Sequence, residues 1–345
     1  MKKIIFATLI SLFLAHSMQA QDCLAAVKKD GSWGYIKPTG EWAIQPKYKA
    51  VQDFSEGMAA VRPDNNWGYI DATGNFIIQP AFNRAEKFSE GLAQASGSDK
   101  EEGGWGYIDK SGNWVITARY SGCQSFSEGL AAVRSGKLWG YIDHAGNMVI
   151  PEQFEHAEHF TEGLARVKKN DKVGFIDKTG NVVIPFDFDG ARDFSDGVAR
   201  VKKDSKWGFI DKTGKVIVPI EYDNAGPFSE GIASVNKGNL WGYVDTEGKL
   251  VIPMSIPYLG LASELSNDRF ISEGMLAMNN KEKLWGFGDR TGKILIPYQY
   301  KNIEPFHCGL AAAKADEKWG FIDQSGKWVS LPQFDNIRKF CPSGN

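Results

Sequence analysis

Short apolar runs alternate with polar turn residues along nearly the whole chain. The runs are four to six residues long and rich in Val, Ile, Tyr, Phe and Trp, and turn residues interrupt them every eight to twelve positions. A helical repeat would need apolar residues at i, i+3, i+4 and i+7 over ten or more positions, which these runs do not provide. The pattern therefore predicts an all-β protein built from short strands.

The same pattern recurs nine times with a period of 34 residues. Trp-Gly pairs begin at Trp33, Trp67, Trp105, Trp139, Trp207, Trp241, Trp285 and Trp319, and a ninth site reads Val173-Gly174. Successive sites are separated by 34, 38, 34, 34, 34, 34, 44 and 34 residues. Tandem units of this kind stack into one array. We therefore expect a single domain over 21–345, with units at about 23–54, 57–88, 91–126, 129–160, 163–194, 197–228, 231–271, 274–306 and 309–340.

Two units are longer than the others. One carries four extra residues around 96–103, and the excess of the other falls mainly within 254–269. Both insertions leave the flanking motif intact, so we expect them to be loops.

The unit that starts at Gly197 shows the expected local structure. Residues 198–202, 207–211 and 216–218 are predicted to form three antiparallel strands. Pro219 follows the third strand. Because proline lacks a backbone donor, it ends that strand or places it at a sheet edge. Each unit is therefore predicted to be a three-stranded meander.

The turn between the second and third strands repeats an Asp-x-x-Gly sequence. In this unit it runs from Asp211 to Gly214. The glycine is expected to adopt a positive φ, and the carboxylate to accept hydrogen bonds from the turn backbone. A catalytic carboxylate is needed only once per protein, so we interpret the repeated Asp as structural, together with the Glu of the repeated Phe-Ser-Glu-Gly element.

The turn between the first and second strands predicts their register. A two-residue turn at Asp30-Gly31 sets Val27 opposite Gly34. It also sets Ala26 opposite Tyr35. Both faces of this pair are largely apolar, so neighbouring units must cover both. We expect Gly34 to make room for a facing side chain, and the Trp before it to pack one unit against the next.

These motifs identify a resemblance to a known family. The consensus Trp-Gly-(Tyr/Phe)-Ile-Asp-x-x-Gly-x-x-(Val/Ile)-Ile-Pro, preceded by Phe-Ser-Glu-Gly-(Leu/Ile)-Ala, resembles the WG repeat, also called the KWG repeat, from about Cys23 to Phe340. The chain departs from it with Val173 for Trp, Lys37 for Asp, Gly288 for Ile and Leu331 for Pro. The resemblance implies a bacterial β-repeat protein that is often exported, and it supplies no catalytic residues.

Two assemblies of nine such units are compatible with the repeat. We favour an open superhelical β-solenoid. The alternative is a closed ring resembling a propeller, whose blades typically have four strands. A unit of 34 residues is short for four strands, which is why the open form is preferred.

The charge balance and the N-terminal segment indicate the class of partner and the localisation of the protein. Lys and Arg total 40 against 42 Asp and Glu, so nucleic acid is not an expected partner. Residues 1–20 are predicted to be a signal peptide, because Lys2 and Lys3 precede an apolar stretch at 4–15 and Ala20 stands at the cleavage point. No later stretch is apolar enough to span a membrane. We expect an exported protein of the periplasm, cell surface or medium.

An exported protein permits disulfides, and the chain has four cysteines. Cys23 falls at the Gly position of the Phe-Ser-Glu-Gly element, and Cys341 falls at its Ser position. If the array closes, the two ends rebuild one such turn, so we hypothesise a Cys23–Cys341 bridge. Cys123 and Cys308 are expected to be free and buried.

The sequence offers little catalytic chemistry. His156 and His159 have the spacing of a metal pair but lack further ligands nearby in the sequence. We therefore expect no catalytic residue, no cofactor and no metal. An enzyme would have to use the insertion at 254–269, which contains Glu264 and Asp268.

For function, we expect a non-enzymatic scaffold that presents a concave surface and loops to a protein partner, as repeat arrays do. The alternative is a cell-surface or secreted glycan-binding protein. It would use exposed aromatic residues such as Trp42, Trp114 or Trp328.

Overall fold

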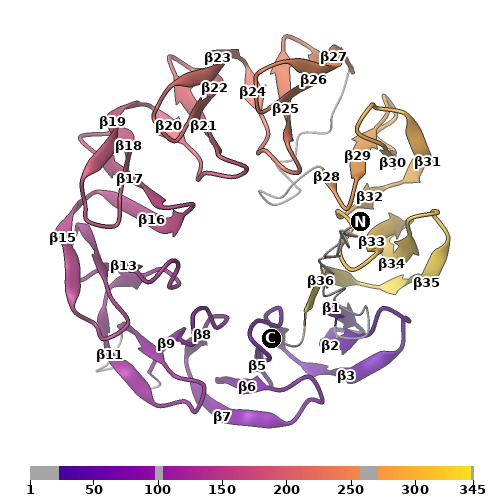
Figure 1. Ribbon diagram of the computed structural model, residues 1–345. Coiled ribbons are helices and arrows are strands. Elements are labelled where there is room, and N and C mark those ends of the chain that lie inside the picture. Colours follow the sequence, from indigo (N-terminus) through magenta and orange to yellow (C-terminus); the bar gives the residue numbers. More distant parts are fainter. Residues whose placement is uncertain (1–22, 98–103, 257–270, 343–345) are drawn as a thin grey trace, which may run out of the picture.

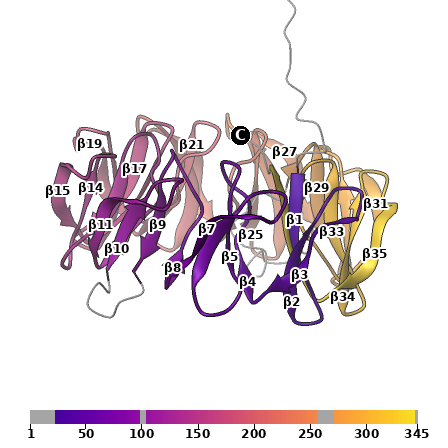
Figure 2. The same cartoon turned by 90° about the horizontal axis from the view of Figure 1, so that it is seen from below.

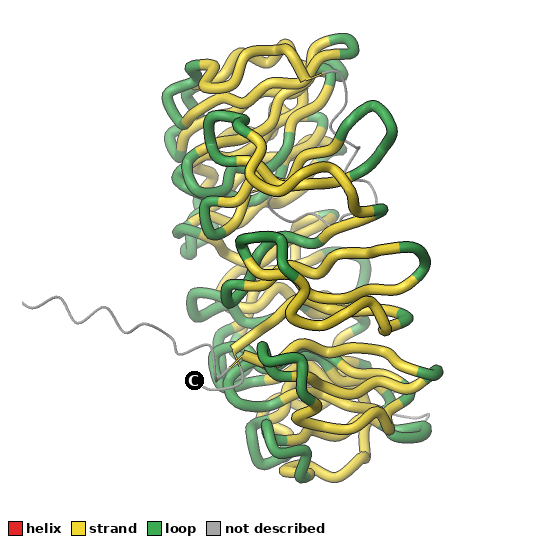
Figure 3. The backbone as a smooth tube through the Cα atoms, turned by 90° about the vertical axis from the view of Figure 1, so that its right-hand side faces the viewer, coloured by secondary structure: helices red, strands yellow, loops and turns green. Residues whose placement is uncertain are grey.

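The computed structural model describes residues 23–97, 104–256 and 271–342. Every element assigned in this part of the chain is a β-strand (Figure 3). The strands form nine antiparallel four-stranded sheets arranged in a ring around a central axis (Figure 1). Each sheet is called a blade below, and blade 1 is the sheet that contains β1.

Each blade has an innermost strand, a second strand, a third strand and an outermost strand. The innermost strands of blades 1 to 9 are β36 (Asn336–Pro342), β4 (Ala50–Val51), β8 (Arg84–Ala85), β12 (Gly122–Cys123), β16 (His156–Thr161), β20 (Gly190–Ala191), β24 (Asn224–Ala225), β28 (Ile271–Ser272) and β32 (Asn302–Ile303). The second strands are β1 (Cys23–Lys29), β5 (Ala59–Arg62), β9 (Ala93–Ser96), β13 (Ala131–Arg134), β17 (Leu164–Lys169), β21 (Val198–Lys203), β25 (Ile232–Lys237), β29 (Met275–Asn279) and β33 (Leu310–Ala315).

The third and outermost strands complete the blades in the same order. The third strands are β2 (Ser32–Ile36), β6 (Trp67–Ile70), β10 (Trp105–Ile108), β14 (Trp139–Ile142), β18 (Lys172–Ile176), β22 (Lys206–Asp211), β26 (Leu240–Asp245), β30 (Trp285–Gly288) and β34 (Lys318–Asp323). The outermost strands are β3 (Trp42–Tyr48), β7 (Phe76–Phe82), β11 (Trp114–Tyr120), β15 (Met148–Phe154), β19 (Val182–Phe188), β23 (Val216–Tyr222), β27 (Leu250–Ile256), β31 (Ile294–Tyr300) and β35 (Trp328–Phe334).

The prediction of three strands per unit is therefore one strand short. The missing strand is the innermost one, which comes from the end of the preceding predicted unit. Ala50 and Val51, for example, belong to the unit at 23–54 but pair with Arg62 and Val61 of the next unit. The predicted register of the first hairpin is confirmed, with Val27 opposite Gly34.

The preferred open solenoid is wrong, and the alternative closed ring is correct. The last strand, β36, pairs antiparallel with the first, β1, and sets Leu24 opposite Cys341. Blade 1 is thus built from both ends of the chain, which removes the two free sheet faces that an open array would expose. The molecule is a nine-bladed β-propeller.

The hydrophobic core is divided among the interfaces between neighbouring blades. One such cluster contains Trp139 and Ile150 of blade 4 together with Ala157, Phe160 and Val167 of blade 5. This confirms that the Trp packs one unit against the next. A cluster of the same kind joins blade 9 to blade 1 and completes the ring.

The glycine after the Trp has a different role from the predicted one. A Cβ atom on Gly34 would lie 2.5 Å from the carbonyl oxygen of Ile44 and 2.8 Å from the nitrogen of Pro46. Both belong to the backbone of β3, whose register against β2 shifts at this point. The missing side chain therefore makes room for the backbone of the outermost strand, not for a facing side chain.

Candidate functional site

The ring has two faces with different turns (Figure 2). The Gly-turn face carries the Phe-Ser-Glu-Gly turns, between innermost and second strands, and the Asp-x-x-Gly turns, between third and outermost strands. The hairpin face carries the turns between second and third strands and the connections from one blade to the next.

Cross-blade hydrogen bonds link the Phe-Ser-Glu-Gly turns to one another. The hydroxyl of Ser127 donates to the carbonyl of Phe160 over 2.7 Å. The carboxylate of Glu128 accepts from the backbone N–H of Gly163 over 3.1 Å and pairs with Lys178. Partial burial would raise the pKa of Glu128, but these bonds outweigh it and hold the pKa below its usual value.

The same contacts recur around the ring. The serine bond joins Ser55 to Phe88, Ser89 to Phe126, Ser195 to Phe228, Ser229 to Ile271 and Ser272 to Phe306. The carboxylate bond joins Glu56 to Gly91, Glu90 to Gly129, Glu162 to Gly197, Asp196 to Gly231, Glu230 to Gly274 and Glu273 to Gly309. The repeated acids of this face therefore make structural contacts.

The Asp-x-x-Gly turns also fit the structural interpretation. In blade 5, Asp177 accepts from the hydroxyl of Thr179 over 2.6 Å and from the backbone N–H groups of Thr179 and Asn181. The bond from the Thr179 hydroxyl, followed by the backbone bonds, holds the pKa of Asp177 below its ordinary value. Gly180 closes the turn with a φ of 88°.

The two cysteine-bearing ends meet, but with a different partner from the one hypothesised. Cys23 is bonded to Cys308, and their Cα atoms are 6.6 Å apart. Cys308 stands at the Glu position of its Phe-Ser-Glu-Gly turn, and Cys23 stands at the Gly position of the next. At the closing interface, a covalent bond thus replaces the contact that Glu and Gly make elsewhere. The hypothesis of a Cys23–Cys341 bridge names the wrong partner, and Cys308 is not free.

The remaining thiol follows the prediction only in part. Cys123 is free, as expected, but it is half-buried rather than fully buried. Burial raises the pKa of its thiol to about 12, so it is protonated near neutral pH. The side chain of Cys341 lies outside the described residues.

Charged side chains gather between blades 5 and 6, beside the innermost strand β16. Arg166 of blade 5 lies 3.0 Å from the carboxylate of Glu158 and 3.1 Å from that of Asp193 in blade 6. His156 contacts the same Glu158 over 2.9 Å. This cluster joins two blades. No group of three or more metal-ligating side chains occurs among the residues that the structure describes.

The breaks in the repeat lie mainly outside the described residues. Residues 98–103 fall between β9 and β10 in the sequence, and residues 257–270 fall between β27 and β28. Glu264 and Asp268 fall in the second of these segments. Val173, which replaces a Trp, is buried in the cluster between blades 5 and 6.

The three aromatic residues named for glycan binding begin outermost strands on different blades. Each packs edge-on against an aromatic ring of the preceding blade, with Trp42 on Phe334, Trp114 on Phe82 and Trp328 on Tyr300. All three are half-buried.

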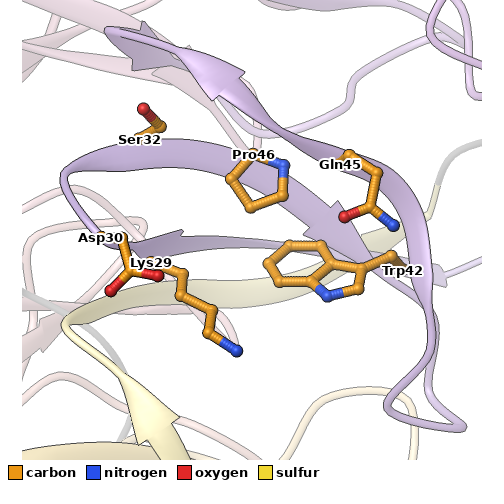
Figure 4. Close-up of a pocket in the computed structure, with 6 residues that line it drawn as sticks. All are labelled: Lys29, Asp30, Ser32, Trp42, Gln45 and Pro46. Atoms are coloured by element: carbon orange, nitrogen blue, oxygen red, sulfur yellow. The ribbon is translucent and has the colours of Figure 1, made fainter.

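Trp42 lines a pocket on blade 1 (Figure 4). The cavity has a volume of about 370 Å³. Its walls come from two parts of blade 1: β3 contributes Trp42, Gln45 and Pro46, and the β1–β2 hairpin contributes Lys29, Asp30 and Ser32. The ammonium of Lys29 donates to the side-chain oxygen of Gln333 on β35, over 3.0 Å.

The outer rim has an apolar surface that the sequence analysis missed. The second residue of the outermost strand is an exposed aliphatic residue in seven blades, with 38–47% of its surface accessible. These residues, called the rim residues below, are Ile77, Val115, Val149, Val183, Val251, Leu295 and Val329. The sequence signal is the apolar pair that begins these strands, followed by Ile-Pro in four of the seven, and it predicts a strand without showing that the pair is exposed.

The comparisons with known proteins agree with this architecture. A family model described as WG containing repeat matches residues 33–67, 67–96, 105–139, 139–172, 174–207, 207–241, 241–256, 285–319 and 319–344. The chain belongs to this family of WG-repeat proteins. No curated protein matches the sequence.

Among solved structures, the chain is similar to a eukaryotic initiation factor, with 12% identity and a TM-score of 0.63, over 93% of this chain and 98% of that one. It also matches Hsv2 from Kluyvelomyces marxianus, with 12% identity and a TM-score of 0.41, over 75% of this chain and 98% of that one. A third match is the extracellular domain of a putative hybrid two-component system from B. thetaiotaomicron, with 12% identity and a TM-score of 0.36. It covers 94% of this chain and 56% of that one. At this identity, the first match reflects the fold alone.

Proposed function

We propose that the protein is an exported, non-enzymatic scaffold that binds a protein partner through its outer rim. The observation that carries this proposal is the set of rim residues on blades 2–5 and 7–9. Exposed apolar surface that continues from one element to the next is typical of protein interaction sites. The recurring carboxylates of the Gly-turn face, by contrast, are engaged in turns, which favours a binding role over a catalytic one.

The rim is suited to side-chain recognition rather than strand addition. The outermost strands contain Pro46, Pro80, Pro151, Pro185, Pro219, Pro253, Pro297 and Pro332. Their registers also shift against the third strands. Proline and irregular pairing protect a sheet edge from an additional strand. A partner would therefore contact the aliphatic side chains.

Two observations support export. The first is the charged and apolar N-terminal segment at 1–20, which lies outside the described residues. The second is the disulfide between Cys23 and Cys308, because disulfides persist mainly in oxidising compartments. The described residues also contain no helix that is long and apolar enough to cross a membrane.

The rim can be tested by capture experiments. Immobilised mature protein should retain a discrete partner from the native envelope or medium, and a Val149→Lys/Val183→Lys variant should lose it. A Lys137→Glu/Lys169→Glu variant changes charge on the hairpin face of the same two blades and should retain it. Titration calorimetry with the purified partner then measures the affinity. Equal affinity for the rim variant and the wild type would exclude the rim.

Glycan binding is the second candidate, and the pocket at Trp42 favours it. Ligand pockets combine apolar or aromatic walls with a few polar groups that fix orientation. The indole of Trp42 and the ring of Pro46 form the apolar wall, and Asp30, Ser32 and Gln45 supply the polar groups. Tryptophan fluorescence with a panel of polysaccharides tests this candidate. Absence of a spectral change with every polymer would count against it.

A further inference from the structure

The pocket on blade 1 differs from the corresponding surfaces of other blades. Blade 6 has the same hairpin charges, Lys203 and Asp204, but its outermost strand begins with Val216 instead of a tryptophan. Blade 9 has the tryptophan, Trp328, but carries Ala315 at the position of Lys29. Of these three blades, only blade 1 brings an indole and an ammonium group to one cavity.

Lys29 is held in a defined position at this cavity. Its side chain extends from the hairpin toward Trp42 (Figure 4). The bond to Gln333 uses one of the three donors of the ammonium, and two remain for a ligand. Holding the side chain in advance lowers the entropic cost of binding.

The acidic groups Asp335 and Asp30 beside the cavity interact with Lys318, which leaves the charge of Lys29 available to a ligand. Asp335, which lies between β35 and β36, is paired with Lys318. The charge of Asp30 also acts on Lys318, whose pKa is raised by Asp335 and, to a smaller extent, by Asp30. Lys29 lines the cavity, and exposed Lys47 lies two residues beyond Gln45 on β3. An anionic ligand is therefore favoured over a cationic one.

We propose that the pocket formed by Trp42, Pro46 and Lys29 binds one uronic acid residue of an acidic polysaccharide. The sugar ring lies against the apolar faces of Trp42 and Pro46. Its carboxylate accepts from the ammonium of Lys29, in a charge-assisted hydrogen bond. Its hydroxyl groups bond to Asp30, Ser32 and Gln45. This inference rests on the second candidate function, and it names the ligand class.

The test uses acidic polymers and their uncharged counterparts. Polygalacturonate, alginate and hyaluronate are titrated into the mature protein, each beside its methyl-esterified form, and binding is followed by calorimetry and tryptophan fluorescence. At least one acidic polymer is expected to bind, and its ester to bind on the order of tenfold more weakly, because esterification removes the charged acceptor.

Matched variants localise the binding. Lys29→Gln and Trp42→Phe should each weaken binding about tenfold. Lys203→Gln changes the equivalent lysine of blade 6, and Trp328→Phe changes the equivalent tryptophan of blade 9, and both should bind as the wild type does. Thermal unfolding of all four variants shows whether a loss of binding reflects a loss of folding. Wild-type affinity in folded Lys29→Gln and Trp42→Phe would overturn the proposal.

Other outcomes separate this inference from the function on which it rests. Equal binding of acid and ester, weakened by Trp42→Phe, would overturn the acidic ligand and keep glycan binding. Binding to none of the polymers, together with no response to the wider glycan panel, would overturn both. Neither result bears on the capture of a protein partner through the rim.

Discussion

Gly140 shows how a single missing side chain fixes the geometry of a blade. A Cβ atom there would lie 2.5 Å from the carbonyl oxygen of Ile150 and 2.7 Å from the nitrogen of Glu152, both in the backbone of β15. Backbone cannot move aside as a flexible side chain can. In the Trp-Gly pair, the Trp therefore packs between blades, and the Gly lets the backbone of the outermost strand approach closely.

Gly140→Ala is expected to destabilise the protein by about 2–3 kcal/mol, because the outermost strand must shift to admit the methyl group. Gly136→Ala, in the same blade, is the control, since no atom lies within 4 Å of its added Cβ. It should change stability by less than about 0.5 kcal/mol. Chemical denaturation measures both. Equal losses would contradict the role assigned to Gly140.

Asp177 links the stability of a turn to pH. Its pKa is held below the usual value in the folded protein, chiefly by the hydroxyl of Thr179. The contribution to stability is therefore present above the unfolded pKa of about 3.9 and is lost as the pH falls through the lower folded pKa. Asp177→Ala should lower stability by about 1 kcal/mol at pH 7, and the difference should shrink toward pH 3. Denaturation curves at both pH values test this, and a difference that grows on acidification would contradict it.

The sequence predicted some residue roles correctly and others not. The Asp and Gly of the second turn followed from turn chemistry, which is local. The role of Gly34 did not, because its neighbour is the backbone of a strand whose irregular register no local pattern reveals.

At the scale of the elements, hydrogen bonds link neighbouring Phe-Ser-Glu-Gly turns. Most Phe-Ser-Glu-Gly turns reach the next one through a serine hydroxyl, a carboxylate or both, so the turns link neighbouring blades on one face. The Glu residues in these turns have positive φ, at 54° for Glu128. The Glu or Asp residues at this position share this backbone conformation, so the same contact can be repeated from one blade to the next.

Glu128→Ala is expected to cost about 1–2 kcal/mol, because Gly163 loses an acceptor and Lys178 loses its ion-pair partner. Glu128→Gln keeps an acceptor for Gly163 and should cost less than about 1 kcal/mol. Thermal unfolding distinguishes the two variants. Equal losses for the two variants would show that the ion pair, rather than the turn-to-turn bond, dominates.

The sequence predicted three strands of each blade and missed the fourth. The three were visible because they carry apolar residues between recognisable turns. Most innermost strands have only two residues, such as Ala50–Val51, and therefore show no periodicity. The rim residues were visible as an apolar pair, but whether such a pair is buried depends on the next blade.

Closure of the ring is a property of the whole molecule. An open array and a ring of the same unit share the same period and composition, so the repeat could not decide between them. The decisive information lay at the two ends, where β36 completes the sheet of β1. The repeat also places Cys308 at the Glu position, opposite the Gly position of Cys23, and that alignment would have identified the pair.

Breaking the Cys23–Cys308 bond is expected to lower the free energy of unfolding by about 3–5 kcal/mol, because the bond links residues 285 positions apart. Cys308→Ser should show this loss in denaturation under oxidising conditions. The double variant Cys23→Gly/Cys308→Glu restores the residues found at the other interfaces and should recover about 1 kcal/mol of it. A Cys308→Ser variant as stable as the wild type would show that strand pairing alone closes the ring.

Non-reducing peptide mapping of the mature protein tests closure most directly. Blades 1 and 9 lie at opposite ends of an open array and side by side in the ring, so only closure brings Cys23 within bonding distance of Cys308. We predict a disulfide-linked peptide pair that contains Cys23 and Cys308, with Cys123 recovered as a free thiol. Recovery of Cys23 and Cys308 as free thiols from protein purified under oxidising conditions would contradict the closed ring.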